Sequence, residues 1–451
     1  MVTRNQNVNM KDNADIEKKL KIYQEEHQRL KTLLNITRNI SREIELESLL
    51  ITIMDEVKKA LMADRCTVFL IDKERNEIWS KVAHGKDKIR FPVYLGIAGH
   101  VATTGEVLNI SDAYSDKRFN PTIDRQTGYR TTNMLTFPMR NKLKEIIGVF
   151  QVLNKHDGAF TGEDENLLGV ISTIAAAQLE NAQLYEEQKK TLDSFVETLA
   201  STIDARDPVT AGHSSRIALY SDHVAKILNL SHKRREILRY SALLHDFGKI
   251  AVREDVLYKN GRLTIEEYCK IQEHPAYTKS ILEKINFSRD FKDVPQIAAA
   301  HHEKMDGSGY PEGLPGNRIP LESRILSVVD VFDALTSKRH YRDRMEFEKV
   351  MDNLEKNCGN QFDKNIFDAF KQIKIGNVLS ILEIDNRDKL EIQDIEFLSQ
   401  FKVILLVGII KKGPNNDEEK EVLSLFNKYY YREHLTSFQD KFNQQLKVAS
   451  I

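Results

Sequence analysis

The sequence predicts a multidomain protein: an α+β module, a long connecting helix, an all-α domain and a small mixed C-terminal extension follow one another. Paired strand-like runs with short turns between them fall within residues 48–183. A helical repeat without Gly or Pro then continues from Val170 to Arg206. Nearly every pattern in residues 207–375 is helical as well. A chain of 451 residues is long enough for two or three such domains.

The composition excludes several classes of protein. Charged residues make up 29% of the chain, yet the formal net charge is only -1, so no basic surface for a nucleic-acid polymer is expected. The three cysteines show no paired spacing, which is typical of a reducing compartment. The first residues are polar, and the longest apolar run, residues 403–410, is too short to span a bilayer. We therefore expect a soluble cytoplasmic protein without a membrane span.

Residues 1–47 are expected to form an N-terminal helix, with the pattern clearest over residues 13–47. Its apolar and aromatic side chains recur at steps of three and four in the short heptad series Leu20, Tyr23, His27, Leu30 and Leu34. This pattern suits a coiled coil between two chains. It equally suits one amphipathic helix that covers its own domain.

Residues 48–183 are expected to form the α+β module. The segment "LESLLITIMDEVKKALM" has a helical period, and "CTVFLID" and "EIWSKVA" form a predicted hairpin around the turn "KERN". A second hairpin is predicted from "NMLTFPMRN" and "EIIGVFQVLNK". Helices before and after these antiparallel strands favour an α+β arrangement.

Residues 163–205 are expected to form one connecting helix with a coiled-coil seam. Because a long helix cannot bury such a seam alone, a parallel homodimer is predicted. The seam positions are Ile171, Ala175, Ala182, Tyr185, Leu192, Val196, Leu199 and Ile203.

Residues 376–451 form the C-terminal extension, for which the sequence suggests no role. They contain the strand-like run "VILLVGII", the break "KKGPNNDEE" and an aromatic amphipathic helix, "VLSLFNKYYYREHL".

Adjacent pairs of ligand-type side chains are the strongest chemical signal. His245 and Asp246 follow an apolar helical run, and His301 and His302 end another helix. An imidazole binds one metal through one nitrogen, whereas a carboxylate has two oxygens and can bridge two metals. Asp330 lies inside an apolar helix, where a carboxylate is costly unless it is paired or metal-bound.

Taken singly, each of these residues could be an ordinary core, capping or salt-bridging side chain. Together they predict a metal centre, and the mixture of imidazole and carboxylate without thiolate favours iron or manganese over zinc. The predicted ligands are His213, His245, Asp246, His274, His301, His302 and Asp330.

Residues 190–375 resemble the HD-GYP subgroup of HD-domain phosphohydrolases. The matching motifs are "LLHDFGKI", "HHEKMDGSGYPEGLPG" and "SVVDVFDALTSKRHYR". The resemblance implies an all-α fold, an iron or manganese centre with the ligands above, and cleavage of cyclic di-GMP to pGpG and in some members on to GMP. Asp246 would hold both ions, and the nucleophile would be a water activated by them.

The same resemblance implies a set of substrate contacts. Tyr310, within the triplet of Gly309, Tyr310 and Pro311, is expected at a substrate phosphate. Lys249 is expected to offset phosphoryl charge as a catalytic cation, with Arg339 and Arg342 as further phosphate contacts.

The chain departs from the family pattern at several positions. Arg342 stands where a lysine is expected, and His340 where a proline is usual; both changes should be tolerated, because arginine can also bind phosphate. Val209 stands where some members carry a third-metal glutamate. Two metals are therefore expected, with Asp204 and Asp207 as the remaining candidates for a third site.

Residues 48–183 resemble a GAF domain, through "GIAGHVATTGEVLNISDAYSDKRFN" and "NKHDGAFTGEDE". In the second motif, the lysine and the aspartate are expected to pair structurally and not to contact ligand. Its ligand could be a cyclic nucleotide or another small molecule, or the domain could serve dimerisation alone. The motif residues are Asn154, Lys155, Phe160, Asp164 and Glu165.

These resemblances lead to one main hypothesis and two alternatives. The main one is a cyclic di-GMP phosphodiesterase regulated by a GAF domain in second-messenger signalling. The first alternative is an enzyme for another nucleotide, such as cyclic GMP-AMP. The second is a receptor or scaffold that binds the dinucleotide without cleaving it.

Overall fold

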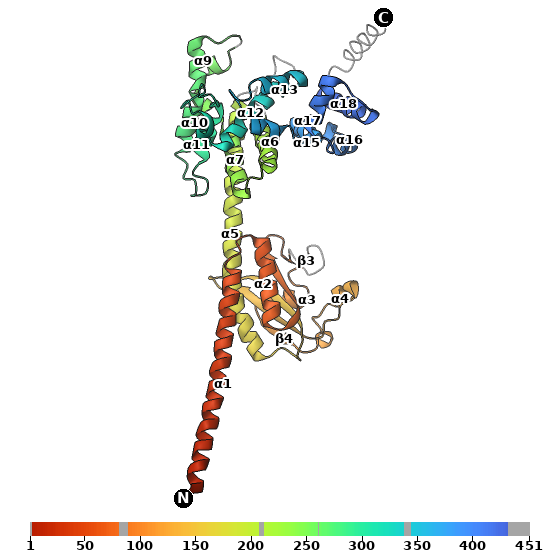
Figure 1. Ribbon diagram of the computed structural model, residues 1–451. Coiled ribbons are helices and arrows are strands. Elements are labelled where there is room, and N and C mark those ends of the chain that lie inside the picture. The colour runs from red at the N-terminus through yellow and green to blue at the C-terminus, as the bar shows by residue number, and fades with distance from the viewer. Residues whose placement is uncertain (1, 81–88, 207–211, 260, 338–343, 432–451) are drawn as a thin grey trace. The chain divides into compact units, whose positions relative to one another are not determined.

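The structure is a computed structural model that describes residues 2–80, 89–206, 212–259, 261–337 and 344–431 (Figure 1). The chain divides into two compact units, an N-terminal unit, Met1–Thr191, and a C-terminal unit, Leu192–Ile451. Among the helices in these ranges, none is both long and apolar enough to cross a membrane.

A six-stranded antiparallel sheet forms the centre of the N-terminal unit, with the strand order β3-β2-β1-β6-β5-β4. The strands are β1 (Ala63–Asp72), β2 (Glu77–Ser80), β3 (Ile89–Pro92), β4 (Leu108–Ile110), β5 (Met134–Arg140) and β6 (Ile146–Lys155). The helices are α1 (Val2–Ile40), α2 (Leu46–Ala60), α3 (Gly96–Thr104), the 3-10 turn η1 (Ala113–Ser115), α4 (Thr122–Thr127) and the first part of α5 (Gly162–Arg206).

Both predicted hairpins are confirmed in the described residues, whereas residues 81–83 of the predicted strand "EIWSKVA" lie outside them. Strands β1 and β2 pair with Asp72 opposite Glu77, and β5 pairs with β6 along its length. Alternation along β1 explains how the sheet is covered: Val68 and Leu70 pack with α2 and α5, whereas Phe69 packs with α3 on the other face. The sequence thus carries the period of two that a sheet buried on both faces requires.

The prediction of a single helix over residues 13–47 is wrong at its end. Helix α1 stops at Ile40, and α2 begins at Leu46 after a short turn. Ile36 and Ile40 are buried in the same core as α2, so the turn lets both helices pack on the sheet. Farther back on α1, Leu20 and Tyr23 are exposed in the single chain.

Helix α5 is continuous, as predicted, but its seam is buried differently from the prediction. Ile171 and Ala175 are buried in the core of the N-terminal unit. Val196 and Ala200 are buried in the core of the C-terminal unit. The seam is therefore buried at these positions without a second chain, contrary to the prediction, although Tyr185 between them is 54% exposed.

The C-terminal unit is helical, and no β-strand element occurs in its described ranges. Its first elements are α6 (His213–Ile227), α7 (His232–Leu244), η2 (Phe247–Ala251), α8 (Glu254–Leu257), α9 (Ile265–Gln272), α10 (His274–Leu282), α11 (Val294–Ala299), η3 (Ala300–His302), η4 (Gly316–Arg318) and α12 (Leu321–Thr336). The later elements are α13 (Phe347–Lys356), α14 (Lys364–Phe370), α15 (Ile375–Leu382), η5 (Ile384–Lys389), α16 (Ile392–Leu398), α17 (Val403–Lys412) and α18 (Asp417–Tyr430).

The mixed character predicted for the C-terminal extension is wrong for residues 376–431. The strand-like run at 403–410 is helix α17, which buries Val403, Leu406 and Ile409 at the three-residue spacing of a helix. These side chains join the same core as Phe347 of α13 and Tyr430 of α18. The described part of the extension therefore completes the core of the C-terminal unit.

Candidate metal centre

The structure brings the predicted metal ligands together at the ends of several helices. His213 is the first residue of α6, and His274 is the first residue of α10. His245 and Asp246 directly follow α7, and the His301–His302 pair forms the end of η3. Asp330 alone comes from the middle of a helix, α12. Loops converge at helix ends, which lets ligands distant in sequence meet.

The ligand atoms form three overlapping groups, and within each group they lie within 4.8 Å of one another. The first group joins His274, His301 and His302, and the second joins His213, His245 and Asp330. The third group, His245, Asp246 and His301, connects the other two.

The two oxygens of Asp246 face opposite sides of the cluster. Oδ1 lies 3.1 Å from Nε2 of His274 and 3.9 Å from Nε2 of His301. Oδ2 lies 3.4 Å from Nε2 of His245 and 3.9 Å from Nε2 of His213. One carboxylate oxygen is thus directed to each group of histidines, which is the arrangement a bridging ligand needs.

Three histidines present a bare Nε2 to the centre of the cluster. In His245, His274 and His301, Nδ1 lies 2.7 Å from the carbonyl oxygen three residues earlier. A carbonyl only accepts, so Nδ1 carries the proton and Nε2 carries a lone pair. Nε2 of His245 is buried and has no hydrogen-bond partner among the described residues. Nε2 of His274 and Nε2 of His301 lie 3.4 Å apart with their lone pairs facing. A cation between such atoms removes both conflicts, so the residues fit divalent metal ions.

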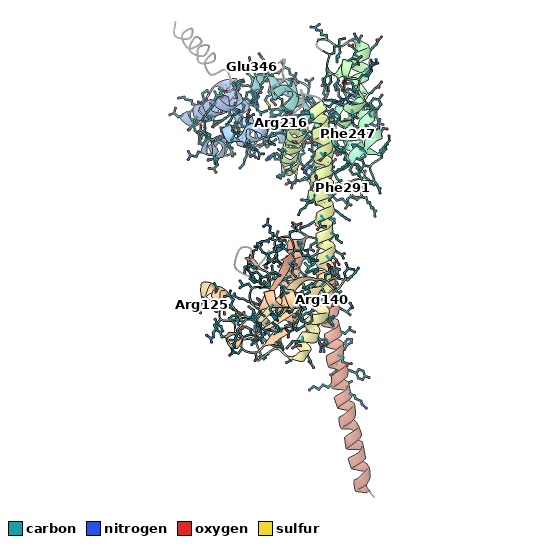
Figure 2. The ribbon with its side chains drawn as sticks, turned by 180° about the vertical axis from the view of Figure 1, so that it is seen from behind. Arg125, Arg140, Arg216, Phe247, Phe291 and Glu346 are labelled. Atoms are coloured by element: carbon teal, nitrogen blue, oxygen red, sulfur yellow. The ribbon has the colours of Figure 1, made fainter. Side chains whose placement is uncertain are left out.

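His213 is oriented by a carboxylate that the sequence did not single out. Asp333 is fully buried one turn after Asp330, and its Oδ2 lies 2.8 Å from Nδ1 of His213. Arg216, which is labelled in Figure 2, lies one turn after His213. It donates to both Asp333 oxygens at 2.7 and 3.0 Å. Nε2 of His213 is left 3.2 Å from Oδ1 of Asp330. The available sequence signal was the second aspartate of "VVDVFDAL", three residues after the first.

Electrostatics differ between the two sides of the cluster. Burial lowers the pKa of His213, but Asp330 and Asp333 raise it by more, to about 10. Burial raises the pKa of Asp333, but hydrogen bonds, led by that from His213, lower it to about 2. On the other side, burial lowers the pKa of His302 to about 4 and the pKa of His301 well below its usual range. That side favours neutral imidazoles, as metal coordination requires.

Lys249 and Tyr310, which are predicted substrate contacts, lie at the cluster. Nζ of Lys249 is 2.7 Å from Oδ2 of Asp246. Burial raises the pKa of Asp246, but Lys249 and His245 lower it by more, so that it stays ionised. The Tyr310 ring lies 4.8 Å from the His302 ring between centroids.

A buried glutamate missed by sequence reasoning closes the loop that carries Tyr310 and Pro311. The carboxylate of Glu303 accepts hydrogen bonds from the backbone N–H groups of Glu312 at 2.7 Å and Leu314 at 2.8 Å. Gly309 permits the loop to fold this tightly, because a Cβ there would lie 2.6 Å from Cα of Glu303. The signal was a glutamate directly after two histidines in the sequence.

Several candidate residues do not join the cluster or lie outside the described residues. Arg339 and Arg342 fall within residues 338–343, and Asp207 and Val209 fall within residues 207–211, all outside the described ranges. Asp204 accepts a hydrogen bond from Oγ of Ser214 at 2.9 Å and belongs to none of the ligand groups.

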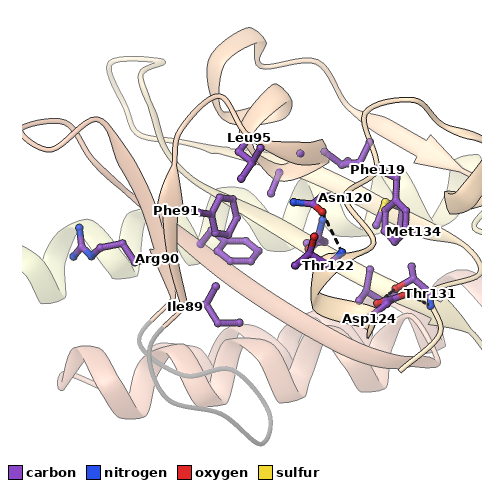
Figure 3. A pocket seen from close by; sticks show the side chains of 16 residues that line it. Ile89, Arg90, Phe91, Leu95, Phe119, Asn120, Thr122, Asp124, Thr131 and Met134 are labelled. Atoms are coloured by element: carbon purple, nitrogen blue, oxygen red, sulfur yellow. Dashed lines mark hydrogen bonds between the residues drawn. The ribbon is translucent and has the colours of Figure 1, made fainter. Parts of the chain in front are cut away.

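The N-terminal unit contains a separate cavity of about 260 Å³ beside the sheet (Figure 3). Its wall is largely apolar and aromatic, and Asp124 in it is occupied by hydrogen bonds from Thr131. The main lining residues are Phe69, Phe91, Leu95, Ile97, Phe119 and Met134, with Arg90, Asn120, Thr122 and Gln151 as further polar groups.

The predicted motif residues of this unit connect its strands and loops with one another and with α5. Lys155 forms an ion pair with Asp164, which also accepts from the backbone N–H of Thr161 at 2.7 Å. Glu165 accepts from Nδ2 of Asn109 at 2.8 Å, and Phe160 is buried. Asn154, at the end of β6, accepts from the backbone N–H of Thr132 at 2.7 Å. None of the motif residues is among those lining the cavity.

Comparisons with known proteins agree with these two units. Residues 197–366 match the family model described as HD domain, and residues 45–179 match that described as GAF domain. The 3′3′-cGAMP-specific phosphodiesterase 3 of Vibrio cholerae serotype O1 is 42% identical over 181 residues, which are 40% of this chain and 39% of that protein.

Two further relatives carry cyclic di-GMP in their names. The cyclic di-GMP phosphodiesterase response regulator RpfG of Xanthomonas campestris pv. campestris is 38% identical over 187 residues, covering 42% of this chain and 48% of that protein. The cyclic di-GMP phosphodiesterase of Thermotoga maritima is 31% identical over 192 residues, covering 43% of this chain and 52% of that protein. The chain thus spans two fifths to one half of the length of these relatives. Residues 45–179 of this chain are a GAF domain, and residues 197–366 are an HD domain.

Proposed function

We propose that the HD domain is a metal-dependent phosphodiesterase that hydrolyses cyclic di-GMP to pGpG, with GMP as the product of any second cleavage. The observation that carries this proposal is the position of Asp246, whose two oxygens face two separate groups of histidines. Relatives named as cyclic dinucleotide phosphodiesterases support the substrate class.

The proposed centre holds two divalent ions, iron or manganese. His274, His301 and His302 would hold one ion with Oδ1 of Asp246, and the second group would hold the other with Oδ2. Imidazole and carboxylate ligands without thiolate suit these metals. Such a pair would lower the pKa of a water and offset charge on the phosphoryl oxygens.

The chain's own side chains would bind and orient the diester. The Lys249 ammonium, close to Asp246, is placed to offset charge that develops on a phosphoryl oxygen. Tyr310 lies beside His302 and would direct its hydroxyl to a phosphate. Arg339 and Arg342 are proposed as contacts to the second phosphate, and Gly309 and Pro311 as the frame of the Tyr310 loop.

The second candidate substrate is 3′3′-cyclic GMP-AMP. A relative 42% identical over 181 residues is named as specific for that dinucleotide. Both substrates present the same ring of two phosphodiesters to Lys249 and Tyr310, so they differ only in the base that the domain would read.

The GAF domain is proposed to regulate this activity by binding a small molecule or a cyclic nucleotide. Its cavity of about 260 Å³, with Phe69, Phe91 and Phe119 in the wall, supports a ligand with a planar ring. A homodimer is proposed through α1, on which Leu20, Tyr23 and Leu30 are exposed.

The test compares both dinucleotides with one preparation. Protein loaded with Mn²⁺, or anaerobically with Fe²⁺, is incubated with cyclic di-GMP and with 3′3′-cyclic GMP-AMP, and the nucleotides are separated by chromatography. The matched variants are Asp246→Ala and Asp255→Ala, because Asp255 is an exposed carboxylate outside the proposed site. We expect pGpG from wild type and Asp255→Ala, and none from Asp246→Ala. Bound but intact dinucleotide would instead support a receptor, and faster cleavage of cyclic GMP-AMP would reassign the substrate.

A further inference from the structure

The end of α5 forms hydrogen bonds with the segment that follows Lys249. Arg206 is the last residue of α5, and its Nη1 donates to the carbonyl oxygen of Ile250 at 2.9 Å. Its Nη2 donates to the carbonyl oxygen of Val252 at 3.1 Å. The hydroxyl of Tyr258 donates in turn to the carbonyl oxygen of Arg206. Arg206 therefore fixes the backbone course of residues 250–252.

This contact differs from the usual role of a cation at the end of a helix. Lysine and arginine there ordinarily interact with the last carbonyls of their own helix. The two carbonyls that Arg206 binds belong instead to residues 44 and 46 positions farther along the chain. Arg206 thus connects two segments, which is more than capping α5 requires.

In the sequence, Lys249 lies between Asp246 and the carbonyl groups that Arg206 binds. Its backbone N–H donates to the carbonyl oxygen of Asp246 at 2.9 Å, and its own carbonyl accepts from the N–H of Val252 at 3.1 Å. The neighbouring Gly248 is packed so closely that a Cβ would lie 1.9 Å from the carbonyl oxygen of His274. Close packing against His274 thus fixes η2 at Gly248, and the hydrogen bonds from Arg206 fix the backbone after Lys249, at Ile250 and Val252.

The same helical turn makes a second contact, next to another residue that faces Asp246. Asp204 accepts from Oγ of Ser214, the residue next to His213, at 2.9 Å. His213 and Lys249 both face Oδ2 of Asp246, at 3.9 and 2.7 Å. The last turn of α5 therefore supports the Oδ2 side of the centre at two points.

We propose that Arg206 is a positioning residue that holds the Lys249 ammonium at Oδ2 of Asp246. The role of Lys249 in turnover rests on the proposed function, but its placement by Arg206 does not. The test therefore combines activity with a measurement on Lys249 itself.

The activity test is a double-mutant cycle. Arg206→Gln removes the charge and the forked donors, Arg206→Lys keeps the charge, and Lys249→Gln removes the group acted upon. We expect Arg206→Gln to lower kcat by about tenfold to hundredfold, because small displacements of a catalytic group are costly. Metal content should stay at the wild-type value, and Arg206→Lys should fall in between. In the Lys249→Gln background, Arg206→Gln should have no further effect to within about twofold.

The matched control is Arg253→Gln in the same segment. The Arg253 side chain is 74% exposed and pairs only with Asp255 among the described residues, so its loss should leave kcat at the wild-type value. Far-UV circular dichroism checks that each variant is folded. If Arg206→Gln matches wild type, or if its effect multiplies with that of Lys249→Gln, the proposal is overturned.

The second test does not depend on turnover. Metal-free protein is labelled briefly with acetic anhydride, and acetylation of Lys249 is measured by mass spectrometry against Lys279, a surface lysine paired with Glu312. We expect Arg206→Gln to raise labelling of Lys249 several-fold and to leave Lys279 unchanged. Unchanged labelling of Lys249 would overturn the positioning role even if the wild type proves to be a phosphodiesterase. Raised labelling in a protein without phosphodiesterase activity would support the positioning role and refute only the proposed function.

Discussion

Asp333→Asn should weaken metal binding although Asp333 contacts no ion in the proposed centre. An asparagine has the same shape but offers one oxygen and one NH₂ group. In wild type, Oδ1 of Asp333 accepts from Nε of Arg216. Oδ2 accepts from His213, from Nη2 of Arg216 and from Oγ of Ser337. Either orientation of the amide therefore places an NH₂ group against a donor.

The size of the loss in metal affinity depends on which donor, His213 or Arg216, loses its acceptor. If NH₂ faces His213, Nδ1 becomes the acceptor, the proton stays on Nε2, and the Nε2 lone pair that a metal ion would need is lost. If NH₂ faces Arg216, the buried guanidinium loses a hydrogen bond and its negative partner. Loss of a carboxylate behind a metal-binding histidine typically costs ten- to a hundredfold in metal affinity, or about 1.4–2.7 kcal/mol.

The assay is a calorimetric titration of metal-free protein with Mn²⁺. The matched control is Asp222→Asn. Asp222 lies on the same helix as His213, is partly exposed, and accepts a hydrogen bond from Nε of Arg235 at 2.8 Å. Asp222→Asn should bind Mn²⁺ like wild type, and circular dichroism should show both variants folded. A folded Asp333→Asn protein with wild-type affinity for Mn²⁺ would refute the claim that Asp333 fixes the His213 proton.

Three further predictions concern metal removal, pH and the Tyr310 loop. Removal of metal by a chelator should lower the unfolding free energy of the HD domain by about 2.7 kcal/mol, compared with protein in free metal at a hundredfold excess over Kd. The unfolding transition followed by Trp79 fluorescence should not change, because this single tryptophan lies in the GAF sheet. Burial raises the pKa of Asp164, but hydrogen bonds led by that from Lys155 bring it below its ordinary 3.8. Asp164→Asn should therefore lower the Trp79-monitored unfolding midpoint at pH 7. The difference from wild type should shrink as pH falls below 3.8 and vanish below the lowered native pKa; a constant difference would contradict the ion pair's role. Glu303→Gln should leave one loop N–H unpaired at a cost of about 1–3 kcal/mol, which would raise KM for the dinucleotide by about fivefold to 150-fold. An unchanged KM would argue against its support of Tyr310.

The sequence predicted the parts of the fold and site that depend on local pattern. Alternating side chains located β1, β2, β5 and β6, and adjacent pairs such as His245–Asp246 pointed to a metal centre before any geometry was known. Such signals are legible because each lies within a few residues of chain.

The remaining features depend on contacts across long stretches of chain. The run at 403–410 reads as a strand by composition, and only packing against Phe347 and Tyr430 selects the helix. In the sequence, Asp333 and Arg216 have the pattern of ordinary charged helix residues. They are 117 residues apart, and only the fold brings them together as a buried ion pair. Propensity and spacing do not encode such partners.

Because α5 contributes side chains to two hydrophobic cores, the choice of fragment ends decides which pieces of this protein can be exchanged. A fragment that starts after Ala200 would lack Val196 and Ala200, which line the interior of the helical unit. A GAF fragment that stops before Leu179 would likewise leave its sheet partly uncovered. Chimeras with other N-terminal domains should therefore be joined inside the helix, between Ala182 and Leu192, where a graft preserves both interiors.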